Sequence, residues 1–220
     1  EDILLLDQTL LSTTSESMAP MPGYREWLKG QDKGPAYRYL KRMLQFLQWQ
    51  KKRNGQQAER WLLKTPHHLH HIAVLLKVFP DAKIVQTHRD PLQTIPSAAS
   101  MNYNLWIMGS DDVDPAVVGE QWAKKYARGT LHTMATREQY PDAFLDVWYK
   151  DTISDPLKSM ESVYQFIGMA FTDEARDAME RYREDNKRDA RPAHEYTLAQ
   201  FGFTESQLKE MFADYRAKYL

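Results

Sequence analysis

The sequence predicts an α/β fold with an unusually high share of helix, and three observations lead to this prediction. Short apolar stretches alternate with longer segments in which apolar residues recur every three or four positions, as on one face of a helix. Of the 220 residues, 42% are hydrophobic, which is enough for a sizeable core. No internal repeat or clear linker divides the chain. We therefore expect residues 1–220 to form a single domain.

The first quarter of the chain is expected to be mostly helical. Glu1–Leu11 is predicted to be a short helix, because acidic residues are favourable at a helix start. Two prolines and several hydroxyl residues predict a loop over Ser12–Gly23. Tyr24–Lys29 is expected to form one or two helical turns. Lys33–Arg53 is predicted to be a long amphipathic helix, with Pro35 in its first turn and Asn54-Gly55 after its end.

The central stretch is predicted to be a strand, a helix and a second strand. The strands are Arg60–Lys64 and Lys83–Thr87, and the helix between them is His68–Phe79. Such a β-α-β unit should be parallel and right-handed. Ligands of open parallel sheets bind beyond the carboxyl ends of the strands. Lys64 and Arg89 lie at or just past these ends, so we expect both to face one crevice and to form an anion site.

The rest of the chain continues the alternation of helices and strands. We expect a helix over Pro91–Leu105 that kinks or ends at Pro96, an acidic loop over Gly109–Asp114, and a helix from Pro115 to about Tyr140. A strand over Ala143–Tyr149 and a helix from Asp155-Pro156 to Phe166, which Gly168 ends, should follow. The last expected elements are a charged helix over Thr172–Lys187, a basic loop over Lys187–Arg191, and a final helix capped by Thr204-Glu205.

Composition excludes several classes of function. The net charge of −1 gives no argument for binding nucleic acid or an acidic membrane surface. Because there is no cysteine, disulfides, thiolate zinc sites and a cysteine nucleophile are excluded. No apolar run approaches the roughly 18 residues of a membrane span. No signal peptide is visible, so we expect a cytoplasmic location. The chain begins at Glu1 rather than Met, which is typical of a fragment or a processed form.

Arg89 and Ser97 form the most informative pair. Ser97 lies eight residues after Arg89, about two helical turns. The guanidinium offers a bidentate fork for phosphate or sulfate, and the hydroxyl adds a neutral donor. Together they could hold a phosphate monoester against the start of the next helix, whose free backbone donors attract anions. Alternatively, Arg89 pairs with Asp90 or another carboxylate and Ser97 is an ordinary helix residue.

Further candidate site residues are Lys64 and the run His67-His68-Leu69-His70-His71. A strand-end lysine can neutralise charge on a transferred group, although a solvated lysine is an equally ordinary reading. On a helix His67 and His71 could grip a metal, but the cluster holds no carboxylate and no HExxH arrangement, so no metal site is predicted. His68 lies nearest the apolar helix face and His70 points away from it. We therefore name His68 as a possible hydrogen-bond donor or acid/base near the crevice.

Two stretches of the sequence resemble the core of the sulfotransferase family. WLLKTPHHL, followed by FPDAKIVQTHRDP and Ser97, is most similar to the bacterial-type branch, and DVWYKDTISDPLKSMESVYQFIGM is similar to a later stretch of the family. The resemblance implies a three-layer, helix-rich fold related to P-loop kinases, with a short parallel sheet. It also implies the sulfuryl donor 3′-phosphoadenosine-5′-phosphosulfate (PAPS) as co-substrate, with no metal required.

Carried over residue by residue, the resemblance implies roles for four side chains. Arg89 and Ser97 would bind the 3′-phosphate of PAPS, Lys64 would lie near the transfer site, and Tyr149 would lie near the nucleotide. The chain has no glycine-rich phosphate loop of the GxxxxGK[ST] or GxGxxG type. The family's loop for the 5′-phosphosulfate is therefore expected before residue 1.

The resulting expectation is transfer of a sulfuryl group from PAPS to a hydroxyl or amine, with release of adenosine 3′,5′-bisphosphate. Three alternatives stay open: a nucleotide-dependent kinase-like transferase, a non-catalytic binding domain that lacks the phosphate loop, and, more remotely, a metal-binding module. The acceptor could be a small molecule, a carbohydrate or a lipid-like compound, and the sequence does not indicate an oligomeric state.

Overall fold

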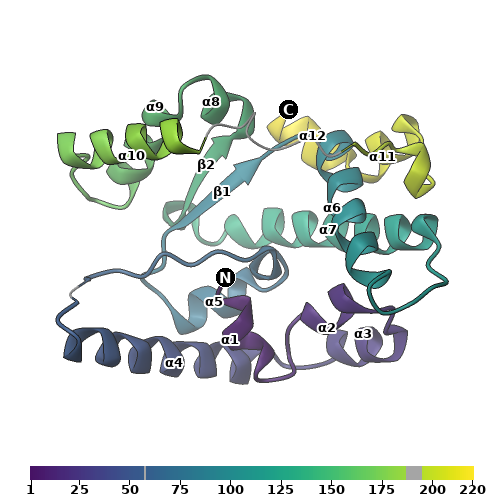
Figure 1. The fold of residues 1–220 in the computed structure, drawn as a ribbon, viewed down its shortest axis with the longest axis horizontal. Helices are drawn as coiled ribbons and strands as arrows, with labels where there is room; N and C mark the ends of the chain where they lie inside the picture. The colour runs from purple at the N-terminus through teal and green to yellow at the C-terminus, as the bar shows by residue number, and fades with distance from the viewer. Residues whose placement is uncertain (57, 187–194) are drawn as a thin grey trace.

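The computed structural model describes residues 1–56, 58–186 and 195–220, and it has the helix-rich α/β architecture that the sequence predicts (Figure 1). The predicted basic loop Lys187–Arg191 lies outside the described residues. The α-helices are α1 (Ile3–Asp7), α2 (Thr14–Met18), α3 (Pro22–Lys29), α4 (Gly34–Arg53), α5 (Ile72–Val78), α6 (Pro91–Trp106), α7 (Pro115–Arg137), α8 (Tyr149–Ser154), α9 (Pro156–Phe166), α10 (Asp173–Asp185), α11 (Glu205–Met211) and α12 (Ala213–Tyr219). The 3-10 helices are η1 (Pro66–His70), η2 (Pro141–Ala143) and η4 (Ala199–Phe201).

The sheet formed by the described residues has two parallel strands, β1 (Ile84–His88) and β2 (Phe144–Trp148). Their register pairs Ile84 with Phe144 and His88 with Trp148, so both strands end at the same level. Helices α8, α9 and α10 lie on one side of the sheet, whereas α4, α5 and α7 lie on the other (Figure 1). The sheet is therefore the middle one of three layers.

The predicted strand Arg60–Lys64 is wrong. A strand requires a neighbouring strand that pairs with its backbone groups, and residues 60–64 pair with neither of the described strands. The backbone N–H of Lys64 instead donates to the Asp2 carboxylate at 2.9 Å. The predicted β-α-β unit is wrong for the same reason, because the parallel partner of β1 is β2, which follows α6 and α7.

Three other predicted elements are corrected. The single helix His68–Phe79 is divided into η1 and α5, because His71 (φ −141°, ψ 25°) leaves the helical region. The predicted loop Ser12–Gly23 contains α2, where the Ser12 hydroxyl accepts from the backbone N–H of Thr14 at 3.1 Å. The final helix is broken at Phe212 (φ −114°, ψ 23°) into α11 and α12. The break lets Phe212 pack in a core cluster with Ile95.

Side-chain caps and prolines explain why the other helices begin where the sequence predicts. An oxygen that accepts the first backbone N–H groups stabilises a helix start by about 1 kcal/mol. Proline in the first turn removes a donor that would have no partner there. The cap residues with such a hydrogen bond are Asp90 for α6, Asp114 for α7, Asp155 for α9, Thr172 for α10 and Thr204 for α11. Pro96 lies inside α6, which nevertheless continues without interruption to Trp106.

Two of the apolar clusters hold the layers together near the amino terminus and the sheet. Leu6 of α1 packs with Tyr37, Leu40 and Leu44 of α4, and all four are nearly or completely buried. A second cluster joins α5 to the sheet through Ile72, Leu76 and Phe144. These contacts fix α1 against α4 and α5 against the sheet.

A buried ion pair fixes α2 to α7. Glu16 and Lys125 form a salt bridge, and their residues are only 2% and 9% exposed. Trp106 of α6 donates from Nε1 to the Glu16 carbonyl at 3.2 Å. Burial lowers the pKa of Lys125 to about 8 even though the Glu16 carboxylate opposes the shift. Removing one partner alone would leave an uncompensated buried charge, which is strongly destabilising.

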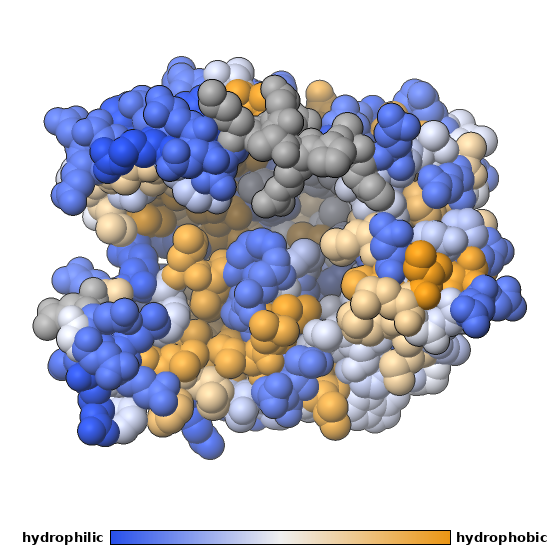
Figure 2. All heavy atoms as spheres, in the orientation of Figure 1, coloured by the Kyte–Doolittle hydropathy of each residue, from blue (hydrophilic) through white to orange (hydrophobic). Residues whose placement is uncertain are grey.

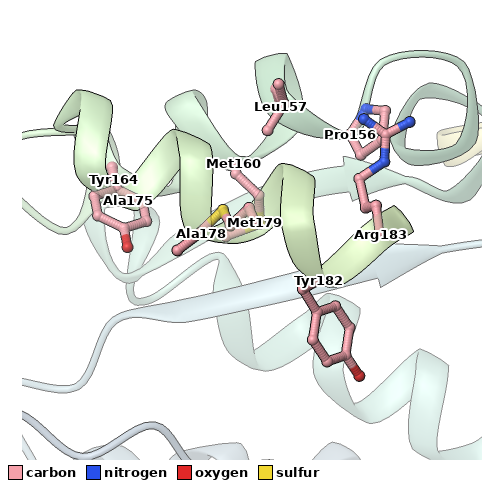
Figure 3. A pocket seen from close by; sticks show the side chains of 9 residues that line it. All are labelled: Pro156, Leu157, Met160, Tyr164, Ala175, Ala178, Met179, Tyr182 and Arg183. Carbon is pink, nitrogen blue, oxygen red and sulfur yellow. The ribbon is translucent and has the colours of Figure 1, made fainter. Parts of the chain in front are cut away.

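The polarity of the surface differs between the upper left and the lower centre of Figure 2. Polar side chains dominate over α9 and α10, whereas apolar side chains gather over α1 and α5. Leu4 of α1 is 63% exposed and Leu62 is 97% exposed. A hollow of about 460 Å³ lies between α9 and α10, lined mainly by apolar side chains that include Leu157, Met160 and Met179 (Figure 3). No helix among the described residues is long and apolar enough to cross a membrane.

Candidate active site

Arg89 and Tyr149 lie together at the carboxyl ends of the two strands. Because His88 pairs with Trp148, the next residue of each strand emerges at the same edge of the sheet. The Arg89 guanidinium carbon lies 4.0 Å from the centre of the Tyr149 ring, which is a close cation–π contact. Arg89 Nε also donates to Gln93 Oε1 at 3.0 Å. The structure thus brings together two of the residues that the sequence names for the nucleotide site.

The Arg89 guanidinium has no carboxylate partner within ion-pair distance in the described part of the chain. Asp90, the alternative partner considered from the sequence, instead forms an ion pair with Arg216. Asp90 Oδ1 also accepts from the backbone N–H of Leu92 at 3.0 Å. An arginine that lies over an aromatic ring without an internal counter-ion keeps donors for an external anion. We call Arg89, Tyr149 and Ser97 the strand-end site.

Ser97 lies two turns into α6 and is half-buried. The expectation of free backbone donors at the start of α6 is wrong, because Asp90 accepts from them. The backbone N–H groups of Gln93 and Thr94 reach the Asp90 carbonyl at 2.9 and 3.1 Å. The first backbone donors of α6 thus have partners, and the roles of the Arg89 and Ser97 side chains in holding an anion stay predictions.

A buried polar network lies directly behind Arg89. His88 is 1% exposed; its Nε2 lies 2.8 Å from Asp146 Oδ1 and its Nδ1 lies 3.0 Å from the Tyr215 hydroxyl. Asp146 also accepts two hydrogen bonds from Arg137, at 2.7 and 2.9 Å. Burial alone would raise the pKa of Asp146, but Arg137 and His88 outweigh it and hold that pKa below its usual value. Burial lowers the pKa of His88, and Asp146 offsets this only in part.

A second cluster, the amino-terminal cluster, consists of Glu1, Asp2, Tyr37, Lys64 and His68. Asp2 is its centre: Oδ1 accepts from the Lys64 backbone, and Oδ2 lies 2.8 Å from His68 Nε2. The other ring nitrogen of His68 lies 2.8 Å from the Tyr37 hydroxyl. Burial would raise the pKa of Asp2, but the hydrogen bond and charge of His68 lower it below its usual value. Burial and the Asp2 charge raise the pKa of Tyr37.

Lys64 and His68 are positioned in different ways within this cluster. The Lys64 side chain is 73% exposed and forms an ion pair with Glu1. The His68 side chain is only 14% exposed, and both of its ring nitrogens have partners. His68 therefore links Asp2 to Tyr37 of α4, so that the backbone at Lys64 is tied to the core.

The two clusters do not touch in the described part of the chain. Lys64 pairs with Glu1, whereas Arg89 donates to Gln93. The strand Arg60–Lys64 does not form, so the expectation that both cations face one crevice stays a prediction. Each cation thus has its own set of partners.

The neighbouring histidines are shielded from solvent to different degrees, since His67 is buried and His70 and His71 are half-buried. His67 is 2% exposed, and burial lowers its pKa to about 2. Burial also lowers the pKa of His70 to about 3 and that of His71 to about 3. His70 packs against Gly129 of α7, where a Cβ atom would lie only 2.7 Å from its ring. In the described ranges, no group of three or more histidine, aspartate or glutamate side chains is arranged to hold a metal ion.

Sequence reasoning missed Asp2, Tyr37 and the His88–Asp146 pair. Two features of the sequence could have indicated the acidic residues among them. Glu1 and Asp2 are adjacent acids before an apolar helix, and Asp146 is a charged residue in the middle of the apolar strand FLDVW. A charge in such a strand requires a partner. Tyr37 gave no signal, because an aromatic residue on the apolar stripe of a helix is usually a core residue.

Comparison with known proteins identifies relatives with a shared name. A family model described as "Sulfotransferase family" matches residues 1–173. Omega-hydroxy-beta-dihydromenaquinone-9 sulfotransferases of Mycobacterium bovis and Mycobacterium tuberculosis are 31% identical to the chain over 116 residues. That match covers 49% of the chain and 28% of each relative.

Two solved structures share the fold over nearly the whole chain. A sulfotransferase of Mycobacterium tuberculosis H37Rv superimposes with a TM-score of 0.81 at 33% identity, covering 97% of the chain and 54% of that protein. A sulfotransferase of Mycobacterium avium gives a TM-score of 0.88 at 26% identity, covering 100% of the chain and 55% of that protein. The chain spans about half the length of these relatives.

Proposed function

Because the chain belongs to the sulfotransferase family, we propose that it forms the part of a PAPS-dependent sulfotransferase that holds the 3′-phosphate of the donor. The strand-end site would bind that phosphate, and the amino-terminal cluster would present Lys64 to the reacting group. The reaction would move a sulfuryl group from PAPS to a hydroxyl or amine of the acceptor and release adenosine 3′,5′-bisphosphate.

One observation carries this proposal. Arg89 lies over the ring of Tyr149 at the carboxyl edge of a parallel sheet, without a carboxylate partner in the described part of the chain. Ligands of open parallel sheets bind at this edge. A guanidinium can bind a phosphate monoester through two parallel hydrogen bonds, and the Tyr149 ring restricts its orientation. The contact between Arg89 and Tyr149 supports their proposed roles, and Ser97 is proposed as a further ligand on the resemblance alone.

The contacts within the amino-terminal cluster suggest different roles for Lys64 and His68. The exposed ammonium group of Lys64 is free to leave Glu1 and stabilise negative charge on the transferred group, in the way that positioned cations assist phosphoryl transfer. His68, predicted from the sequence as catalytic, has both ring nitrogens engaged. We therefore assign it a positioning role, in which it holds the Asp2 carboxylate that accepts from the Lys64 backbone.

Calorimetric titration with adenosine 3′,5′-bisphosphate tests the donor site. Arg89→Ala should weaken binding by about 1.5–3 kcal/mol, or roughly 10- to 150-fold, the value of a hydrogen bond to a charged group. Arg176 is a matched control, because it also lies over an aromatic ring, that of Phe171 at 4.8 Å, but far from β1 in sequence. Arg176→Ala should leave affinity unchanged. Equal affinity in the wild type and Arg89→Ala would overturn the assignment.

We propose a lipid-like hydroxyl compound as the acceptor. The support is the name of the curated relatives, which are sulfotransferases of an omega-hydroxy menaquinone. The exposed apolar side chains near α1, such as Leu4 and Leu62, are compatible with an apolar acceptor. Transfer of labelled sulfate from PAPS to an omega-hydroxy isoprenoid, compared with a simple sugar, tests this class. Preference for the sugar would contradict it.

The remaining predictions from the sequence stay proposals. Residues 1–220 are proposed to be one domain, the location to be cytoplasmic, and the reaction to need no metal. The titration also separates the alternatives. A kinase-like transferase should prefer ATP with magnesium to adenosine 3′,5′-bisphosphate, and a non-catalytic binding domain should bind neither nucleotide.

A further inference from the structure

Helix α12 contacts the residues on both sides of Arg89. The Tyr215 hydroxyl lies 3.0 Å from His88 Nδ1, and Arg216 forms an ion pair with Asp90. The neighbours of Arg89 in the chain are therefore both held by one helical segment that lies far from them in sequence.

The same helix also holds the end of the other strand. The Tyr219 carbonyl accepts from Trp148 Nε1 at 2.8 Å, and Trp148 immediately precedes Tyr149. The Tyr219 ring stacks on His88, with centroids 4.1 Å apart and planes inclined by 20°. Its hydroxyl lies 3.0 Å from an Arg137 nitrogen, and Arg137 in turn holds Asp146. Helix α12 thus fixes the position of one strand relative to the other (Figure 1).

The two tyrosines that make most of these contacts are buried, which restricts their movement. Tyr215 is 6% exposed and Tyr219 is 7% exposed. Burial raises the pKa of Tyr215 to about 12. Its hydroxyl holds His88, the residue that immediately precedes Arg89. Both ring nitrogens of His88 are engaged, so the ring cannot rotate without breaking a buried hydrogen bond.

We propose that α12 is a clamp that positions Arg89 over Tyr149, and that Tyr215, Arg216 and Tyr219 are positioning residues of the donor site. None of the three lies in the region that the family model matches, residues 1–173. The inference rests on the proposed function, because it takes Arg89 as the ligand of the 3′-phosphate. It adds that helix α12 is needed to hold Arg89 in place, although α12 itself does not bind the phosphate.

The first test measures how well the protein distinguishes two nucleotides. The affinity for adenosine 3′,5′-bisphosphate divided by that for adenosine 5′-monophosphate isolates the contribution of the 3′-phosphate. Arg216→Ala and Tyr215→Phe should each lower this ratio about five- to tenfold, since a small misplacement of a positioned group has a large effect. Affinity for the monophosphate should stay within about twofold. Arg216→Lys should recover part of the ratio.

The control variant is Lys209→Ala on α11. Lys209 is a half-exposed cation that pairs with Glu205 and not with the strand ends. It should leave the ratio unchanged. Circular dichroism and thermal unfolding of each variant show that it folds, and Tyr215→Phe keeps the ring that packs against His88.

A second measurement tests the clamp without any nucleotide. The side-chain Nε–H of Arg89, which is bonded to Gln93, can be followed by NMR and assigned through the loss of its signal in Arg89→Lys. Its hydrogen exchange should become about tenfold faster in Arg216→Ala and Tyr215→Phe, because local opening becomes easier.

The outcomes separate the two proposals. A lower ratio with faster Arg89 exchange supports the clamp. An unchanged ratio, an equal loss of affinity for both nucleotides, or unchanged exchange in both variants would overturn it. If Arg89→Ala itself does not change the ratio, the assignment of Arg89 to the 3′-phosphate fails, while faster exchange would still show that α12 positions this side chain.

Discussion

The strand-end site and the amino-terminal cluster each contain a cation, but only the cation of the amino-terminal cluster is paired with a carboxylate of the described chain. Arg89 lies over an aromatic ring with no carboxylate partner among the described residues, whereas its neighbour Asp90 is neutralised by Arg216. Lys64 is paired with Glu1, and its backbone is held by Asp2. If both cations bind an external anion as proposed, Arg89 could do so with little rearrangement, whereas Lys64 would first have to leave an internal partner.

The two regions also differ in how they are supported. Behind Arg89 lies a network in which carboxylate, imidazole, guanidinium and phenol groups are matched, so that each charge has a partner. Beside Lys64 lie the buried His67, whose pKa is lowered to about 2, and the half-buried His70 and His71, whose pKa values are each lowered to about 3. Four expected results would sharpen or break this comparison.

Acid should destabilise the amino-terminal region first. The pKa values of His67, His70 and His71 are lowered by burial, so between about pH 6.5 and pH 3 the unfolded state binds more protons than the folded state. Stability must therefore fall as the pH falls through this window, by up to about 1.4 kcal/mol per pH unit for each histidine. Amide hydrogen exchange at pH 7.5 and 5.0 should show η1 and α5 opening before β1 and β2.

His71→Gln should reduce the slope of the free energy of unfolding against pH, measured by urea unfolding, because it removes one of the groups whose pKa is lowered in the folded state. Earlier opening of β1 and β2 than of η1 and α5 would contradict the prediction that acid destabilises the amino-terminal region first.

Lys64→Ala should affect the rate of transfer rather than the binding of the donor. Loss of a positioned cation or donor typically lowers kcat by about 100-fold. In the protein at its natural length, we expect that loss in kcat with little change in KM for PAPS, and the reverse pattern for Arg89→Ala. Steady-state kinetics of both variants measures the split. A raised KM with unchanged kcat in Lys64→Ala would place both cations in one binding site.

Asp146→Ala should destabilise the strand-end region by about 2–3 kcal/mol, because Arg137 and His88 would lose their shared partner in a half-buried setting. The free energy of unfolding from urea titration measures this. Asp142→Ala, an exposed aspartate just before β2, should cost almost nothing. Equal values for the two variants would show that the network does not stabilise the sheet.

Glu1→Gln should have the smallest effect, below about 0.5 kcal/mol, because its ion pair with Lys64 is largely exposed to solvent. Thermal unfolding should barely shift. A large loss of stability would mean that the pair is structural, and Lys64 would then be less available for chemistry than Arg89.

Local sequence signals predicted most of the helices, because their determinants lie within a few residues. Pro115 after Asp114 and Asp155 before Pro156 are a cap and a first-turn proline, and both helices begin there. The strand Arg60–Lys64 could not be judged in this way, since a strand depends on a partner far away in sequence. The break at His71 is also invisible to a helical wheel, because η1 and α5 together keep an apolar spacing.

The candidate site was predictable to a similar degree. Arg89 and Tyr149 follow the two strands that form, so their meeting required only that β1 and β2 pair in parallel. Asp2, His88 and Tyr215 were missed, because their partners are 66, 58 and 127 residues distant. No local pattern encodes such pairs.

The distance from β1 to α12 has a consequence for how the protein is made. His88 and Tyr215 are separated by 127 residues, and ribosomes add roughly 5–20 residues per second, so α12 is synthesised on the order of ten seconds after β1. Until then, His88 lacks one of its buried partners and Asp90 lacks its counter-ion. During translation the end of β1 is therefore incompletely packed, and a prematurely terminated chain would lack the contacts that α12 makes with His88 and Asp90.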